Sequence, residues 1–153
     1  FKGFQFLIGV LDKLWQEDHG KFELHIYTNT NVEREYITHM QDGYPYSQLE
    51  EIFDNTDLLI VPSQWYETFG FTVLEALSYG VPVMVSDKVG AQDLLCTQYI
   101  FAGEKSLKKI LQEMEKDKKI LALANDSNVK NFMPMQMNRH STIIKEKLYR
   151  KLS

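Results

Sequence analysis

Two glutamates, Glu67 and Glu75, stand eight residues apart and are the side chains of this sequence best suited to chemistry. Glu75 is the only charged residue from Thr68 to Ser86. A carboxylate inside so apolar a segment is costly to remove from water unless a polar group pairs with it. Because each carboxylate has two acceptor oxygens, a ligand with neighbouring hydroxyl groups is a suitable partner. One alternative stays open, in which Glu75 lies on a solvent-facing stripe of a helix.

The segment around these glutamates predicts a strand, a helix and a second strand in succession. The apolar run Leu58–Val61 indicates a buried strand. A helix is expected over Phe71–Tyr79, because Gly80 follows it where a C-terminal glycine usually stands, and a second buried strand over Val81–Val85. Such a unit builds a parallel sheet.

The start of the expected helix is a candidate phosphate site. The N–H groups of its first turn, at about 70–73, have no partner within the helix, and the helix dipole favours an anion there. Glu67 belongs to the loop over the same edge of the sheet. A ligand with both a phosphate and hydroxyl groups is therefore expected across this edge.

These residues resemble the Glu-x7-Glu motif of the retaining glycosyltransferases of family 4, which have the GT-B fold. The motif reads Glu67-Thr-Phe-Gly-Phe-Thr-Val-Leu-Glu75, with Pro62-Ser63 before it and Gly80-Val81-Pro82-Val83 after it. Two carboxylates alone would be a weak indication, whereas the pair within these flanks is a strong one. The resemblance implies that Glu67 contacts hydroxyls of the transferred sugar and that Glu75 contacts the ribose of the nucleotide. It also implies that the diphosphate and sugar meet the backbone of Phe69, Gly70, Phe71 and Thr72.

Lys2 is a further candidate, because enzymes of this family carry a Lys-Gly pair after the first strand of their C-terminal domain. There the lysine pairs with the donor diphosphate, and Lys2-Gly3 resembles that pair. Without the resemblance, a lysine near the end of a chain is more often a solvated surface charge. The chain starts at Phe1 inside an apparent element, so we interpret it as a fragment without its first strand.

Other elements predict an α/β fold with a doubly wound parallel sheet, the C-terminal half of a GT-B fold by resemblance. A capping box at Ser47–Glu50 predicts a helix start. The remaining strands are expected over 22–27, 36–40 and 99–101. Helices are expected over 4–20, 48–55, 90–95 and 118–131, and a further one begins at about Ser106. The resemblance implies that residues around His39 and Met40 line the pocket for the base of the nucleotide. Without the resemblance, the sequence indicates only a structural or surface histidine at position 39.

The last segment, 135–153, is predicted as a basic amphipathic helix after a domain that covers 1–134. Such a helix suits an anionic membrane surface. It also suits packing on an N-terminal domain absent from this sequence, which the resemblance favours.

The length, composition and net charge of the chain limit the classes of function that it can have. The chain has 153 residues, 44% hydrophobic and 25% charged, which is typical of one globular domain. It shows neither a membrane-spanning apolar run nor a signal peptide, and its one cysteine, Cys96, indicates a reducing, cytoplasmic compartment. A net charge of −4 argues against a nucleic-acid partner.

The sequence lacks the motifs of several common nucleotide-binding and metal-dependent enzyme classes. The sequence contains no Gly-x-Gly-x-x-Gly, no Gly-x4-Gly-Lys-[Ser/Thr], no His-Glu-x-x-His and no Asp-x-Asp pair that would hold a metal against a diphosphate. We therefore expect no cofactor and no metal. The departing diphosphate would be stabilised by a basic side chain and a helix N-terminus.

Together with the resemblance, these observations predict the donor-binding domain of a retaining, metal-independent glycosyltransferase that uses a nucleoside-diphosphate sugar. The resemblance also implies that the saccharide or glycolipid acceptor meets the missing N-terminal domain, as in bacterial surface polysaccharide synthesis, on the cytoplasmic side or at the inner face of the membrane. The chain alone would bind donor and transfer little. The alternative is a non-catalytic sugar-nucleotide module. A flavodoxin-like signalling domain shares the sheet but gives no reason for Glu67 and Glu75.

Overall fold

The computed structural model describes residues 3–17 and 22–116. Lys2, the helix expected over 118–131 and the basic segment 135–153 lie outside the described residues.

Helices and strands alternate along the described chain, which confirms the predicted α/β fold class with parallel strands. The elements are α1 (Phe4–Glu17), β1 (Leu24–Ile26), β2 (Ile37–Met40), α2 (Leu49–Asp54), β3 (Leu59–Val61), α3 (Phe71–Ser78), β4 (Val83–Ser86), β5 (Ile100–Phe101) and α4 (Glu104–Lys116). Short 3-10 turns cover η1 (Tyr46–Gln48), η2 (Gly90–Leu94) and η3 (Thr97–Tyr99).

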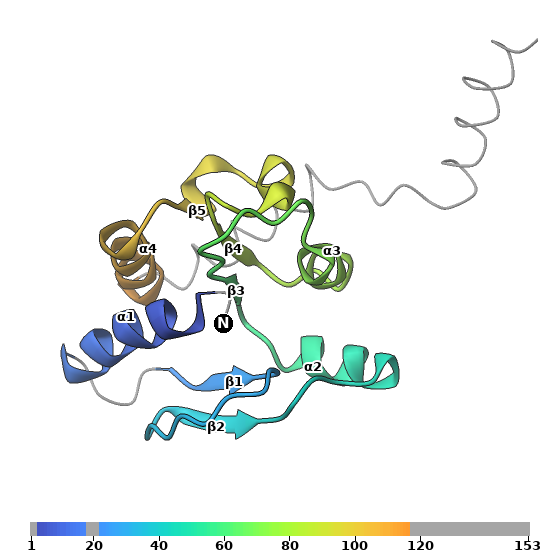
Figure 1. The fold of residues 1–153 in the computed structure, drawn as a ribbon, viewed down its shortest axis with the longest axis horizontal. Helices are drawn as coiled ribbons and strands as arrows, with labels where there is room; N and C mark the ends of the chain where they lie inside the picture. Colours follow the sequence, from blue (N-terminus) through green and yellow to red (C-terminus); the bar gives the residue numbers. More distant parts are fainter. Residues whose placement is uncertain (1–2, 18–21, 117–153) are drawn as a thin grey trace, which may run out of the picture.

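The strands form two parallel sheets where the sequence predicts one. β1 pairs with β2, and β4 lies between β3 and β5. Every residue of β4 is buried, whereas β3 is only half-buried because one of its edges has no described neighbour. Figure 1 shows α1 and α4 on one side of the sheet β3-β4-β5 and α3 on the other. This is the layered arrangement that a doubly wound sheet requires.

Two apolar clusters fill the layers. In the first, the periodic face of α1 packs with Leu107 and Met114 of α4. The buried residues of that α1 face are Leu7, Ile8, Val10, Leu11 and Leu14. In the second, Val73, Ala76 and Leu77 of α3 pack against α2 and the buried side chains of β4. The second cluster fixes α3, and with it Glu75, relative to the ends of β3 and β4.

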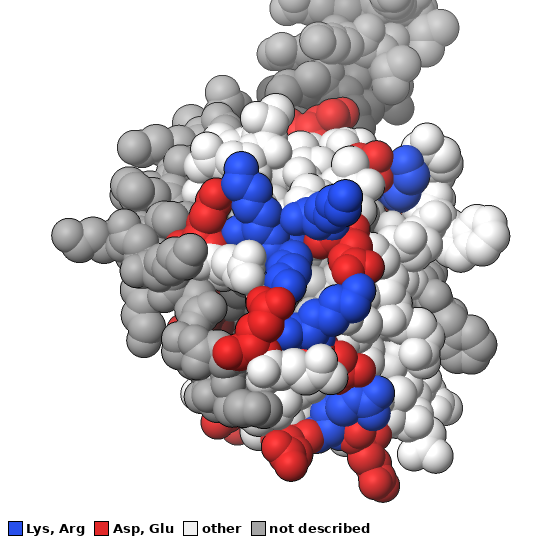
Figure 2. All heavy atoms as spheres, turned by 90° about the vertical axis from the view of Figure 1, so that its left-hand side faces the viewer, with Lys and Arg blue, Asp and Glu red and all other residues white. Residues whose placement is uncertain are grey.

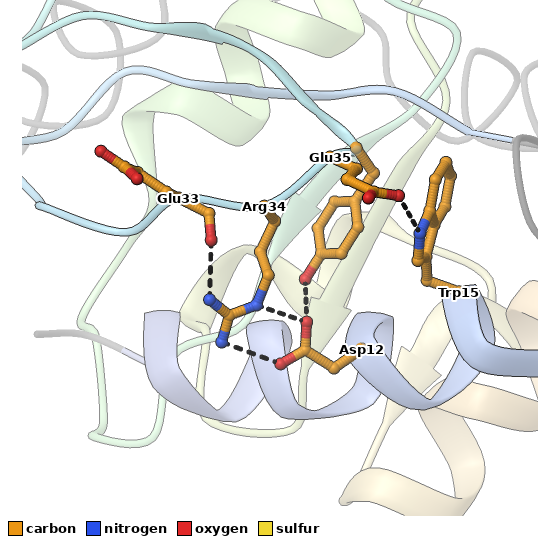
Figure 3. A network of polar contacts seen from close by, with 6 residues as sticks. Asp12, Trp15, Glu33, Arg34 and Glu35 are labelled. Carbon is orange, nitrogen blue, oxygen red and sulfur yellow. Dashed lines mark hydrogen bonds and ion pairs between the residues drawn. The ribbon is translucent and has the colours of Figure 1, made fainter.

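A polar network ties α1 to the segment that enters β2 (Figure 3). The carboxylate of Asp12 accepts hydrogen bonds from Arg34 Nε at 2.7 Å, from Arg34 Nη2 at 3.1 Å and from the buried Tyr36 hydroxyl at 2.7 Å. The Arg34 hydrogen bond holds the pKa of Asp12 below its ordinary value, and the Tyr36 hydrogen bond acts in the same direction against partial burial. Trp15 Nε1 donates to Glu35 Oε2 at 3.4 Å nearby.

The predicted capping box is wrong. Ser47 lies inside the 3-10 turn η1, and α2 begins at Leu49 with no side-chain cap. Pro45 has an extended backbone (φ −72°, ψ 150°) and starts the turn, so Ser47 lacks the extended conformation that an N-cap needs. The helix expected from Ser106 starts two residues earlier, at Glu104.

Charges of both signs alternate on the face built by α1 and α4 (Figure 2). Lys13 pairs with Glu104, Lys108 with Glu17, and Lys109 with Glu113. Among the residues of this face that the structure describes, the lysines are therefore interspersed with acidic side chains and form no separate basic patch of the kind that nucleic acid requires. Within residues 3–17 and 22–116, no helix is both long and apolar enough to cross a membrane.

Candidate functional site

The backbone of Glu67 is held at the carboxyl end of the sheet β3-β4-β5. Its N–H donates to the carbonyl of Lys88 at 2.9 Å, and its carbonyl accepts from the N–H of Gly90 at 2.9 Å. These bonds make a short parallel bridge between Glu67 and Val89. A Cβ at Gly90 would lie 2.4 Å from the carbonyl oxygen of Thr68, so the close approach of the segment after β4 to the loop that carries Glu67 requires glycine at position 90.

The side chain of Glu67 is half-buried and is reached by Ser63, the second residue after β3. Ser63 Oγ donates to Glu67 Oε1 at 3.0 Å, with the carbonyl oxygen of Trp65 as a competing acceptor at 3.1 Å. Ser63 is itself buried, and its carbonyl accepts a hydrogen bond from Ser86 Oγ at 2.6 Å. Two serines at the ends of neighbouring strands thus orient Glu67.

Neither serine was predicted as a functional residue from the sequence, where Ser63 served only as part of the flank that precedes the motif. A detectable signal existed, since each is a hydroxyl residue at or just after the end of a buried run in adjacent parallel strands. The carboxyl ends of such strands meet at one edge of the sheet.

The N-terminus of α3 lies beside Glu67. Gly70 precedes the helix with φ of 125°, a conformation that other residues rarely adopt. Val89, which forms the short parallel bridge with Glu67, also packs against Gly70, because its Cγ1 would lie 3.1 Å from a Cβ at that position. The N–H of Ala91 donates to the carbonyl of Phe69 at 3.1 Å. The segment after β4 therefore holds both Glu67 and the helix start.

No acidic side chain stands in the first turn of α3, so the partial positive charge of the helix start is not neutralised by the helix itself. Thr72 is half-buried, and the rings of Phe69 and Phe71 are exposed with centroids 5.3 Å apart. Trp65 and Tyr66, on the same loop, are also exposed, and Lys88 Nζ lies 5.1 Å from the centre of the Tyr66 ring.

Glu75 lies in the second turn of α3 and is half-buried. Its Oε2 accepts a hydrogen bond from the Tyr44 hydroxyl at 3.3 Å. Burial raises the pKa of Tyr44, and the charge of Glu75 raises it further, with the nearby Thr72 hydroxyl acting in the opposite direction. Glu75 is therefore a partnered carboxylate rather than part of a fully exposed stripe. The sequence carried no signal for Tyr44.

Aromatic side chains continue from Tyr44 toward β1 and β2. Tyr27 meets Tyr44 edge-on at 5.5 Å and His39 at 5.1 Å. His39 Nε2 is buried and has no hydrogen-bond partner among the described residues. Met40, the other residue expected near a base, is 40% exposed.

Gly3 brings the start of α1 to the same end of the sheet. A Cβ at Gly3 would overlap the carbonyl oxygen of Pro62, which follows β3, and Gly3 has φ of 87°. Lys2, its neighbour in sequence, lies outside the described residues, so its predicted role stays a prediction. Within 3–17 and 22–116, no group of three His, Cys, Asp or Glu side chains is placed to hold a metal ion. Metal independence also stays a prediction.

Two comparisons with known proteins give a match. The model of the family described as "Glycosyl transferases group 1" matches residues 2–131. A solved structure of sucrose-phosphate synthase from Thermosynechococcus elongatus aligns with a TM-score of 0.58 and 20% sequence identity over 93% of this chain. The match covers 33% of that protein, so this chain spans about a third of its length. At this identity the likeness supports the fold alone. No curated protein matches the sequence.

Proposed function

Because the chain belongs to the glycosyl transferases of group 1, we propose that it binds a nucleoside-diphosphate sugar as the donor-binding domain of a retaining glycosyltransferase. The observation that carries the proposal is the arrangement at the carboxyl ends of β3 and β4. There the held carboxylate of Glu67, the start of α3 at Gly70 and the partnered carboxylate of Glu75 follow one another along a single loop and helix.

The ligand would extend along that loop and helix. Glu75 would accept hydrogen bonds from ribose hydroxyls, and Glu67 would accept them from hydroxyls of the transferred sugar. The diphosphate would lie at the backbone of Phe69, Gly70, Phe71 and Thr72, where the helix dipole favours an anion. Because the net charge of the chain is −4, a diphosphate needs local donors of this kind, and Lys2 is the proposed basic one.

In the proposed reaction the bond between the anomeric carbon and the diphosphate oxygen breaks, and the diphosphate leaves with the electron pair. An acceptor hydroxyl then forms the new bond on the same face of the sugar, and its proton passes to an oxygen of the departing diphosphate. The backbone N–H groups and Lys2 would stabilise the charge on the leaving diphosphate, so the donor site would need no metal.

The acceptor would be a saccharide or a glycolipid held by a further domain, since this chain spans only a third of the matched solved protein. We propose that the basic segment 135–153 packs on that domain in preference to an anionic membrane surface. The setting would be polysaccharide synthesis on the cytoplasmic side of a membrane. The alternative, a non-catalytic sugar-nucleotide module, predicts that a longer parent protein transfers no sugar with or without Glu67→Gln.

Calorimetric titration of the chain with UDP, GDP and ADP, each with and without EDTA, tests the donor site. We expect one nucleotide to bind without metal and Glu75→Gln to weaken it about ten- to a hundredfold, because hydrogen bonds to a charged acceptor are lost. Glu113→Gln is the matched control, since Glu113 lies on α4, across the sheet from α3, where it pairs with Lys109. Equal affinity of wild type, Glu75→Gln and Glu113→Gln would contradict the proposal.

A further inference from the structure

Tyr44 and Glu75 meet from elements that are distant in sequence. Tyr44 belongs to the segment between β2 and η1, and Glu75 projects from the second turn of α3. The two side chains are 31 residues apart in sequence and are joined by the 3.3 Å hydrogen bond from the Tyr44 hydroxyl to Glu75 Oε2. The hydroxyl therefore reaches the carboxylate proposed to bind ribose.

The Tyr44 ring is fixed by its surroundings. It is partly buried against the apolar cluster of α2, α3 and β4, and Tyr27 packs edge-on against it at an interplanar angle of 87°. A ring held on two sides has little rotamer freedom left to lose. The glutamate, by contrast, has three rotatable bonds, and ordering such a side chain opposes binding.

The hydroxyl acts as a donor at neutral pH. Burial first and the charge of Glu75 second raise the pKa of Tyr44, so its proton is retained. With Oε2 engaged by Tyr44, Oε1 and the second lone pair of Oε2 can accept from a ligand. Two neighbouring hydroxyl groups, as in ribose, match that acceptor pair.

We propose that Tyr44 is a positioning residue, which holds the Glu75 carboxylate in the orientation that accepts both ribose hydroxyls and so selects ribonucleotide over deoxyribonucleotide donors. The inference rests on the proposed function. It goes beyond that proposal in assigning the sugar selectivity of the nucleotide to a hydrogen bond made within the protein.

The test compares a nucleoside diphosphate with its 2′-deoxy analogue by calorimetry, using the nucleotide that the wild-type chain binds best. In Tyr44→Phe the ring contacts remain and only the hydroxyl is lost. We expect the ratio of the two affinities to fall roughly three- to tenfold, the effect of one net hydrogen bond on a half-buried carboxylate. Tyr46→Phe is the matched control, because Tyr46 lies two residues away with 82% of its surface exposed, and the ratio should not change.

A double variant separates positioning from general structural effects. In a Glu75→Ala background, Tyr44→Phe should leave the ratio unchanged, since the carboxylate that Tyr44 orients is gone. Equal ratios in wild type, Tyr44→Phe and Tyr46→Phe, with Glu75→Gln still weakening ribonucleotide binding, would overturn the inference and leave the donor site intact. Absence of nucleotide binding in the wild-type chain would overturn the proposed function and the inference together.

Discussion

Replacement of Gly90 by alanine tests how the loop that carries Glu67 is held. A Cβ at position 90 would stand 2.4 Å from the carbonyl oxygen of Thr68, 2.9 Å from its carbonyl carbon and 3.0 Å from the carbonyl oxygen of Glu67. All three atoms are backbone, so no side-chain rotation relieves the overlap. The loop must move away from the segment after β4.

That movement strains the two hydrogen bonds of the bridge, each 2.9 Å long, which join Glu67 to Lys88 and Gly90. Overpacking of a close contact costs about 1–3 kcal/mol. For a chain of this size, 1 kcal/mol shifts the midpoint of thermal unfolding by roughly 2–4 °C. We therefore expect Gly90→Ala to lower the midpoint by about 2–12 °C in differential scanning calorimetry. Donor affinity should fall as well, because Glu67 moves with the loop.

Gly9→Ala supplies the matched control. Gly9 lies within α1, and a Cβ there would meet no heavy atom within 4 Å. Alanine in a helix interior is favoured over glycine by about 0.5–1 kcal/mol, so this variant should be slightly more stable than wild type. Unfolding of Gly90→Ala at or above the wild-type midpoint, or an equal change of nucleotide affinity in the two variants, would contradict this account of the loop.

Two further predictions concern polar contacts that orient the elements. Ser63→Ala removes the hydroxyl that donates to Glu67 Oε1. We expect this variant to lower the free energy of unfolding in urea by about 1–3 kcal/mol, because the lost hydrogen bond joins a buried donor to a charged acceptor. An unchanged urea midpoint would show that the hydrogen bond contributes nothing to stability. The hydrogen bond from Arg34 holds the pKa of Asp12 in the folded state below its ordinary value of 3.8, so the stabilising effect of Asp12 is present above about pH 4 and is lost as the pH falls through the folded value. Asp12→Asn should therefore lower the urea midpoint at pH 7 and make it less sensitive to acid than in wild type, and parallel pH profiles would refute this.

The central unit of the fold was predictable because its signals are local. Apolar runs and a glycine on either side of the helix place strand, helix and strand at 58–61, 71–79 and 81–85 in the sequence. The structure has β3, α3 and β4 at Leu59–Val61, Phe71–Ser78 and Val83–Ser86. Each boundary differs by two residues or fewer, since burial and glycine punctuation act within the segment itself.

The capping box failed for the opposite reason. The residue pattern at Ser47–Glu50 was correct, but the backbone at Pro45 starts a turn that places Ser47 in a helical conformation. A motif read from side chains alone does not report the backbone angles of the preceding residues, so the competing turn decided the outcome.

The sequence by itself determined the family resemblance, the parallel α/β class and the pair Glu67 and Glu75, because an eight-residue spacing within one loop and helix is a local property. Only the tertiary structure decided what holds each carboxylate. Ser63 reaches Glu67 because Ser86 and the end of β4 fix its place, and Tyr44 reaches Glu75 across 31 residues of chain. The Tyr44 contact depends on the packing of α2, α3 and β4 into one core, and no periodicity or spacing along the chain encodes it.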